Sequence, residues 1–563
     1  MSGRVVMLAL LAITAVLIVM PIGVLGIGSF LTDPPRAMHF DWSQLTLGNY
    51  SAILDSQGFG LMLARTLGAA LGGTVGAVVI GVGLAWLTTR TDVPGRGGLS
   101  AVAVMPMFVP PLVGAFAWDI LASPRSGMIN ILLRSAGISF NFNAYTVAGI
   151  TFVFAIYYAP YVFLLVSAAL RNMDPVLEEA SALSGAGRLR TALQITVPLA
   201  LPAVMSSSLM VFILLVQVFA IPVVLGEPGN IQFISQRIWA MVGFSPPQIN
   251  VASALGMMLL ALTLCLVLMQ RAVLRRRSYV TVAGKGLRPR VVELGAARWP
   301  LALLGYGYLL LVAVLPYFAL AFIALRRNLF FSNVAQMFNL KQFNFDQFIR
   351  VIYDPFVQLS LKNSLWVALG TVVFGCSLYF AVAYVIERTK LRGRRLLSLI
   401  AAMPLAIPGL ILGLGYLWSW VSIPVGLTGT LWIIIMSYIA QFAPQGVYAI
   451  SAALVQIHPE LEESSRLSGA GMLATLRRIV LPLAWPGLLS AIILLVVMSF
   501  RELSAVLFLY STNTVVFALS MFDDWVRGAN GLVAVMALLQ SVIVLAVVLT
   551  GQLVGKRPTD TVL

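Results

Sequence analysis

The chain has 563 residues, of which 60% are hydrophobic and only 10% are charged, and its mean hydropathy is +0.96. A soluble protein carries about 25% charged residues, so this composition excludes an ordinary soluble enzyme or binding domain. The formal net charge of +16 does not indicate a nucleic-acid partner, because the basic residues lie mostly in short segments between long apolar runs, as in the loops of a membrane protein.

Apolar runs of about 20 residues recur along the whole chain, which is the length that crosses a bilayer as a helix. Backbone polar groups must be satisfied within lipid, and the runs do not alternate in polarity as barrel strands do. The sequence therefore predicts an all-α polytopic protein in contact with membrane lipid, with about 12 transmembrane helices. The expected spans are 5–31, 61–88, 100–122, 145–170, 197–225, 250–271, 299–324, 361–386, 397–420, 428–453, 481–510 and 532–553.

The two halves of the chain repeat one another. Met105-Pro106 matches Met403-Pro404 at an offset of 298 residues, and a polar stretch beginning at Glu178 matches one beginning at Glu462 at an offset of 284. Two six-helix repeats of the same orientation imply a pseudo-two-fold axis along the membrane normal. We expect a first transmembrane half at 1–271, a basic linker at 272–298 and a second transmembrane half at 299–563.

Most of the 36 basic residues fall on one side of these spans, where the linker also lies. Loops rich in lysine and arginine remain in the cytoplasm, so this side is predicted to be cytoplasmic. Because each half has an even number of spans, both termini lie on the same side. The chain is expected in a bacterial inner membrane.

Two polar islands interrupt the apolar sequence on that side. The first runs from Glu178-Glu179 to Gly187, after Asp174-Pro175, which is a favourable helix start. The second runs from Glu462-Glu463 to Gly471. Each predicts a short helix, a glycine turn and a second short helix at the membrane surface. A single copy is equally compatible with an interfacial loop, but two equivalent copies favour a docking surface for a two-fold-related partner.

At these residues the sequence resembles a known family. Permeases of binding-protein-dependent ABC importers carry the pattern Glu-Ala-Ala, three residues, Gly, nine residues, Ile-x-Leu-Pro. Both islands match it, with Ser181, Ser464 and Ser465 at alanine positions and Val197 at the leucine position of the first island. The resemblance identifies the residues that dock an ATPase through coupling helices: Glu178, Glu179, Ala180, Ser181 and Gly185, and Glu462, Glu463, Ser464, Ser465 and Gly469.

The resemblance implies the type I importer permease fold, two copies of a cytoplasmic ABC ATPase and a periplasmic substrate-binding protein. The chain has no nucleotide-binding Gly-x-x-x-x-Gly-Lys-Ser/Thr motif, so it is expected to be no enzyme, with ATP and magnesium on the partner and no cofactor of its own. A single chain that contains both halves resembles the permeases of the ferric-iron type. Relatives of that type carry 2-aminoethylphosphonate, thiamine or polyamines, which remain alternatives.

Five residues are candidates for the transport path or its gate. Arg501 and Glu502 follow a long apolar run, where charge is costly and points to function. The alternative is a structural pair near the outer interface. Gln217 is the counterpart of Arg501, which predicts an asymmetric path. Pro110 and Pro408 interrupt equivalent helices, as ordinary kinks or as marks of a translocation site. Neither set has the ligands of a metal site.

A secondary transporter of the major facilitator type is the main rival, since it also has two six-helix halves. Asp92-x-x-Gly95-Arg96 faintly resembles that family, but the islands have no role there. A membrane enzyme would need a clustered set of acids, bases or nucleophiles, and the sequence shows none.

Overall fold

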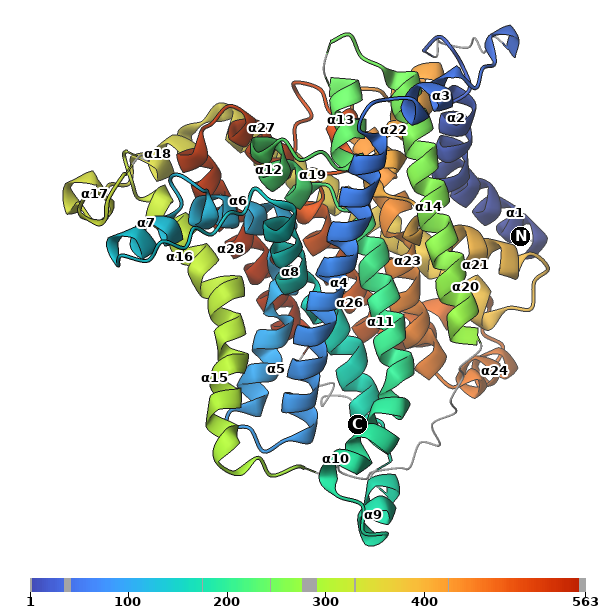
Figure 1. Ribbon diagram of the computed structural model, residues 1–563. Helices are drawn as coiled ribbons and strands as arrows, with labels where there is room; N and C mark the ends of the chain where they lie inside the picture. Colours follow the sequence, from blue (N-terminus) through green and yellow to red (C-terminus); the bar gives the residue numbers. More distant parts are fainter. Residues whose placement is uncertain are drawn as a thin grey trace.

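The computed structural model describes residues 3–34, 42–174, 176–243, 245–275, 291–328, 331–423 and 425–555. Within these ranges the chain is helical (Figure 1). Ten helices are long and apolar enough to cross a membrane, and two further pairs of helices are each joined through a sharp bend. The all-α prediction of about 12 spans is therefore confirmed, with the two bent pairs counted as one span each. Residues 276–290 of the expected linker lie outside the described ranges.

The first half begins with the span Gly3–Gly28, made of α1 (Gly3–Thr14), a π-helical turn and α2 (Met20–Gly28). The other membrane helices of this half are α4 (Phe59–Arg90), α5 (Arg96–Val104) with α6 (Pro111–Ala122), α8 (Val147–Arg171), α11 (Val197–Gln217) and α14 (Ile249–Arg275). The shorter helices are α3 (Gly48–Leu54), α7 (Met128–Ser135), α9 (Val176–Leu183), α10 (Arg188–Thr191), α12 (Ala220–Gly226) and α13 (Ile234–Gly243).

The second half repeats this order. Its membrane helices are α15 (Arg298–Leu309) with α16 (Leu315–Ala324), α19 (Pro355–Gly370) with α20 (Cys376–Arg388), α21 (Arg394–Ala402) with α22 (Gly409–Ser422), α23 (Leu431–Gln456), α26 (Leu481–Arg501) and α28 (Asn530–Gly555). The shorter helices are α17 (Val334–Met337), α18 (Asp346–Tyr353), α24 (Pro459–Leu467), α25 (Met472–Thr475) and α27 (Phe517–Val526).

The third span of each half is not the single helix that the sequence predicted. The chain bends by 97° before α6 and by 110° before α22. Pro110 and Pro408 sit at the two breaks with ψ angles of 135° and 136°, which are extended rather than helical. Proline lacks an N–H and clashes with the preceding turn, so a helix ends there.

The expected spans 197–225 and 481–510 were too long. The helix α11 ends at Gln217 and α26 ends at Arg501, and the next residues, Val218 and Glu502, are extended. Both segments remain apolar beyond these points, because the turns that follow are buried within the protein rather than exposed to water.

The first span of each half packs against the other half. The helix α2 lies on α22, and α15 lies on α5. The Tyr416 hydroxyl donates to the Leu17 carbonyl at 2.7 Å, and the Tyr308 hydroxyl donates to the Ile156 carbonyl at 2.7 Å. Small residues permit this approach, as is usual between membrane helices. The two halves of the sequence are therefore interleaved in space.

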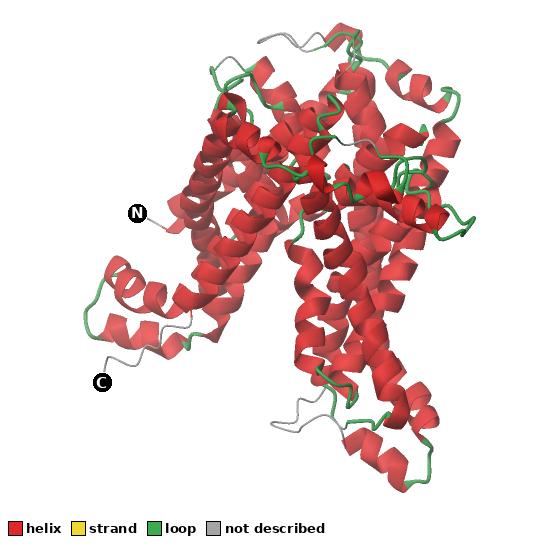
Figure 2. Cartoon of the chain, turned by 90° about the vertical axis from the view of Figure 1, so that its left-hand side faces the viewer, coloured by secondary structure: helices red, strands yellow, loops and turns green. Residues whose placement is uncertain are grey.

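Both islands lie toward the same end of the molecule (Figure 1). In the side view, the helices form two groups that diverge toward this end, and each group carries one island at its tip (Figure 2). We call this end the island face and the other end the opposite face.

Candidate functional site: two anchored islands

The first island has the helix-turn-helix that the sequence predicted. The Asp174 carboxylate accepts a hydrogen bond from the Val176 backbone N–H at 2.9 Å, which begins α9. Gly185 has a φ of +80° and ends the helix in the left-handed conformation that glycine favours. After α10, a π-helical turn leads into α11. Pro175 and the side chain of Glu179 lie outside the described part of the chain.

The second island repeats this geometry. The helix α24 is followed by Gly469 with a φ of +81°, then by α25 and a π-helical turn that leads into α26. In both islands a hydroxyl pair joins the two short helices: Ser181 to Thr191 and Ser465 to Thr475, each at 2.9 Å. The serines at alanine positions of the family pattern therefore tie each island into one unit.

The first glutamate of the first island points into the protein. Glu178 is buried, and its carboxylate lies 3.1 Å from the Arg90 guanidinium at the end of α4. The Thr196 hydroxyl donates to the same carboxylate at 2.8 Å, and Arg90 also donates to the Leu170 carbonyl. A buried ion pair is stabilised when further hydrogen bonds satisfy its groups. Thr196 and the Leu170 carbonyl supply such bonds here, whereas the buried Arg90 Nε has no described hydrogen-bond partner.

The second island is also anchored by a buried glutamate that pairs with an arginine, but its hydroxyl partner is a tyrosine instead of a threonine. Glu462 is buried, 3.4 Å from the Arg388 guanidinium at the end of α20. The Tyr384 hydroxyl donates to it at 2.9 Å, and Arg466 lies 3.9 Å away. Glu178 and Glu462 can therefore influence a docked protein only by positioning the islands. Sequence reasoning missed Arg90 and Arg388, although their place in the repeat was a signal.

The solvent-facing surface of the islands holds five of the other predicted residues. Glu463 and Ser464 are exposed, as are Ala180 and the turn glycines Gly185 and Gly469. Leu183 and Leu467 occupy equivalent positions, and each is 90% exposed. The two islands therefore present matching surfaces, each with one fully projecting leucine on a polar helix.

The candidate path residues separate in the structure. Arg501 donates to the Met107 carbonyl, in the turn before the bend of the first half. The Glu502 carboxylate instead accepts from the Gln441 side chain at 2.9 Å and from the Ala505 backbone at 3.1 Å. Among the described residues, no ion pair joins Arg501 to Glu502. The side-chain nitrogen of Gln217 is buried without a described hydrogen-bond partner.

Aromatic residues of both halves meet toward the opposite face. Phe219 and Trp239 of the first half lie 6.0 and 5.6 Å, ring centre to ring centre, from Phe522 of α27. A cavity of about 300 Å³ lies beside them and is lined by residues of both halves, including Tyr510 and Asp523. Burial raises the pKa of the Asp523 carboxyl above its ordinary value, and nearby Arg527 opposes that rise. The halves are thus in contact here while the islands lie apart.

Among the described residues, no group of three or more histidine, cysteine, aspartate or glutamate side chains is placed to hold a metal ion. The sites that the structure defines are the anchored islands, the two bends and the meeting of the halves. All three features are consistent with a membrane protein built from two repeated halves.

Comparison with known proteins agrees with this class. The sequence profile of the binding-protein-dependent transport system inner membrane component matches residues 73–279 and 372–559, which is more than half of the chain. The chain therefore belongs to this family of ABC importer permeases, as the islands predicted. The major facilitator alternative is wrong, because the matched profile appears once in each half.

Two ferric transport permeases match most of the chain, and a 2-aminoethylphosphonate permease matches a part of it. The putative ferric transport system permease protein FbpB 1 of Haemophilus influenzae is 29% identical over 457 residues, covering 79% of this chain and 70% of that protein. The ferric transport system permease protein FbpB of Actinobacillus pleuropneumoniae is 28% identical over 490 residues, covering 85% and 69%. The putative 2-aminoethylphosphonate transport system permease protein PhnV of Salmonella typhimurium is 27% identical over 177 residues, covering 30% and 67%.

Among solved structures, a bacterial ABC transporter involved in the import of the acidic polysaccharide alginate is similar, with a TM-score of 0.38 and 20% identity. That likeness covers 46% of this chain and 96% of the matched chain.

Proposed function

We propose that this chain is the fused permease of an ATP-driven importer that carries ferric iron from the periplasm to the cytoplasm. The pair of anchored islands is the observation that carries the proposal. Two equivalent surfaces at the tips of diverging helix groups suit two copies of one ATPase subunit. The ferric substrate is supported by the names of the two relatives that match most of the chain.

In this proposal ATP and magnesium belong to the partner ATPase, and each island is a coupling helix seated on one ATPase copy. The exposed residues Glu463, Ser464, Leu467 and Gly469 contact the partner in the second half, with Ala180, Leu183 and Gly185 in the first. We assign Glu179 to the same surface from its place in the motif. The island face and both termini are cytoplasmic, since the basic loops lie there.

ATP-driven closure of the partner would draw the islands together. Because Arg90 and Arg388 tie the islands to α4 and α20, that movement would pass directly to membrane helices. The contact between the halves at the opposite face would then open toward a periplasmic substrate-binding protein. We assign Pro110 and Pro408 to the proposed path, and their positions at the bends before α6 and α22 support this.

The test is reconstitution of the chain in proteoliposomes with the ATPase and the substrate-binding protein encoded beside it. We expect uptake of ⁵⁵Fe that requires ATP and the iron-loaded binding protein. Uptake of labelled 2-aminoethylphosphonate, thiamine or spermidine in place of iron would reassign the substrate. Uptake that proceeds without an ATPase would contradict the proposed mechanism.

A further inference from the structure

Arg501 is a charged residue at the meeting of the two halves. It ends α26 of the second half, and its guanidinium donates to the Met107 carbonyl of the first half. Arginine has five N–H donors, and this described bond uses one of them. No ion pair with Arg501 occurs among the described residues. Its side chain is half-buried, so its charge is available to a molecule between the halves.

The neighbouring acid does not neutralise this charge at close range. The Glu502 carboxylate is partly buried and accepts hydrogen bonds from Gln441 and Ala505, and it forms no described ion pair with Arg501. Arg501 and Glu502 therefore have different hydrogen-bond partners although they are consecutive. Glu502 holds the turn after α26, whereas Arg501 faces the first half.

Two tyrosine side chains lie within electrostatic range of the guanidinium. Tyr158 of α8 and Tyr317 of α16 both interact electrostatically with Arg501, and Tyr161 stacks on Tyr158 with ring centres 5.7 Å apart. These tyrosines come from both halves of the sequence. Phenol hydroxyls donate hydrogen bonds, as the guanidinium does, so the group presents several donors.

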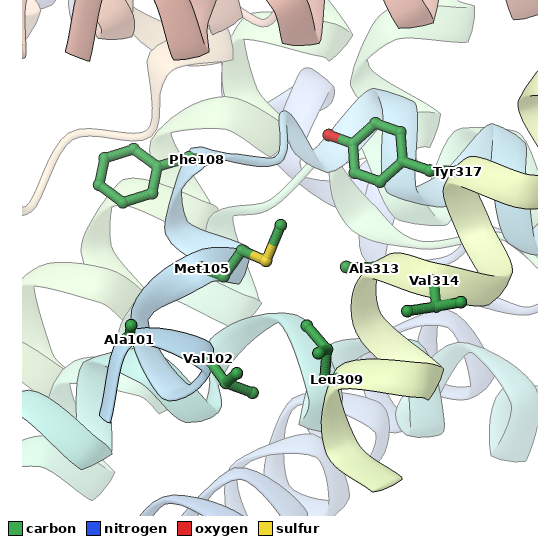
Figure 3. A pocket seen from close by; sticks show the side chains of 8 residues that line it. All are labelled: Ala101, Val102, Met105, Phe108, Leu309, Ala313, Val314 and Tyr317. Atoms are coloured by element: carbon green, nitrogen blue, oxygen red, sulfur yellow. The ribbon is translucent and has the colours of Figure 1, made fainter. Parts of the chain in front are cut away.

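A cavity of about 520 Å³ has Tyr317 in its wall, and Met105 and Phe108, in the turn whose Met107 carbonyl accepts from Arg501, also line it (Figure 3). It lies between α5 with its following turn and the first span of the second half, and the Tyr317 hydroxyl is turned toward that turn. The other lining residues are apolar: Ala101, Val102, Met105, Phe108, Leu309, Ala313 and Val314. Tyr317 thus connects an otherwise apolar space to the Arg501 charge.

We propose that Arg501, with Tyr158 and Tyr317, recognises anionic oxygen atoms on the transported substrate. A guanidinium repels a bare ferric ion but binds carboxylate or phosphonate oxygens through charge-assisted hydrogen bonds. This inference rests on the proposed function and defines its substrate class: ferric iron would pass as a complex that retains anionic oxygen ligands. A phosphonate would satisfy the same group directly. Gln217 replaces the arginine in the first half, so the site occurs once.

Uptake by the complete importer in proteoliposomes tests the proposal. The probes are ⁵⁵Fe delivered by the iron-loaded binding protein with citrate or with phosphate, and labelled 2-aminoethylphosphonate. For Arg501→Gln we expect uptake of the transported probe to fall about tenfold or more, as loss of a charged hydrogen bond predicts. Arg501→Lys should keep most of the activity. Arg350→Gln, an exposed arginine on α18, is the control and should match the unmodified protein.

Unchanged uptake in Arg501→Gln would overturn the inference, and so would increased uptake, which a path for a bare cation predicts. If iron uptake is the same in Arg501→Gln as in the unmodified protein, the proposed function is supported and only this inference is contradicted. If the importer takes up phosphonate in a manner that depends on Arg501 but takes up no iron, the inference about Arg501 is kept and the proposed ferric substrate is contradicted.

Thermal unfolding of the solubilised permease gives a readout that does not depend on transport. Inorganic phosphate, 2-aminoethylphosphonate and ferric citrate should raise the Tm above that in chloride at equal ionic strength. The increase should be lost in Arg501→Gln and kept in Arg501→Lys and Arg350→Gln. If none of these oxyanions raises the Tm of the unmodified protein, or if Arg501→Gln keeps the increase, the inference is wrong.

Discussion

The Arg90 guanidinium, only 2% exposed, lies 3.1 Å from the Glu178 carboxylate, 88 residues further along the chain. Arg388 and Glu462 form the equivalent pair at 3.4 Å. Each pair ties an island to the end of the second span of its own half. Each buried charge pair therefore joins an island to a second membrane helix, in addition to α11 or α26, into which the island leads directly.

Glu462→Gln should uncouple the importer. Removing one partner of a buried ion pair leaves an uncompensated charge and costs about 3–5 kcal/mol, so we expect a lower Tm and less uptake per ATP hydrolysed. Glu460→Gln is the matched control, because Glu460 is in the same helix but has an 80% exposed side chain. Equal behaviour of the two variants would contradict the anchoring role.

The hydroxyl partners of the anchors differ between the islands, which allows a sharper test. Thr196→Val and Tyr384→Phe each remove one hydrogen bond to a buried carboxylate, worth about 1.5–3 kcal/mol. Measured by unfolding, Tyr384→Phe should be non-additive with Glu462→Gln, because the residues are in contact. Thr196→Val should be additive with Glu462→Gln, since it acts on the other island. The opposite pattern would refute the assigned contacts.

Gly469→Arg should leave the protein inserted but prevent docking of the ATPase. A β-carbon at this glycine would meet no atom within 4 Å, so the substitution costs only the left-handed conformation, about 1–2 kcal/mol. Gly528→Arg carries the same conformational cost, with a φ of +78° and no neighbour, in the loop between α27 and α28. Co-purification of the ATPase should be lost in the first variant and kept in the second.

Gly415→Val should disrupt the packing between the first span and the other half. A β-carbon at Gly415 would lie 2.6 Å from the Pro21 carbonyl oxygen, which is backbone and cannot rotate away. Overpacking of this kind costs about 1–3 kcal/mol or more, and the Tm of the solubilised protein should fall accordingly. Gly23→Val in the facing helix is the control, because no atom lies within 4 Å. Similar destabilisation by both changes would count against the close approach.

Features that depend on neighbouring residues could be predicted from the sequence. Hydropathy predicted the membrane spans, and the internal repeat predicted the two halves. The glycines predicted the turn between the two short helices of each island. Prolines marked the breaks before α6 and α22, but not the size of the bends. The expected spans that ran past Gln217 and Arg501 were wrong because a buried turn and a membrane helix have the same apolar composition.

Only the tertiary structure decided which of two identical adjacent side chains is buried. Glu462 is anchored and Glu463 is exposed, because Arg388 approaches from a distant span. The crossing of the first spans and the contact of Arg501 with Met107, 394 residues apart, have the same origin. Local sequence sets helix periodicity and breaks, whereas the partner of a side chain depends on how distant helices pack, which no nearby residue encodes.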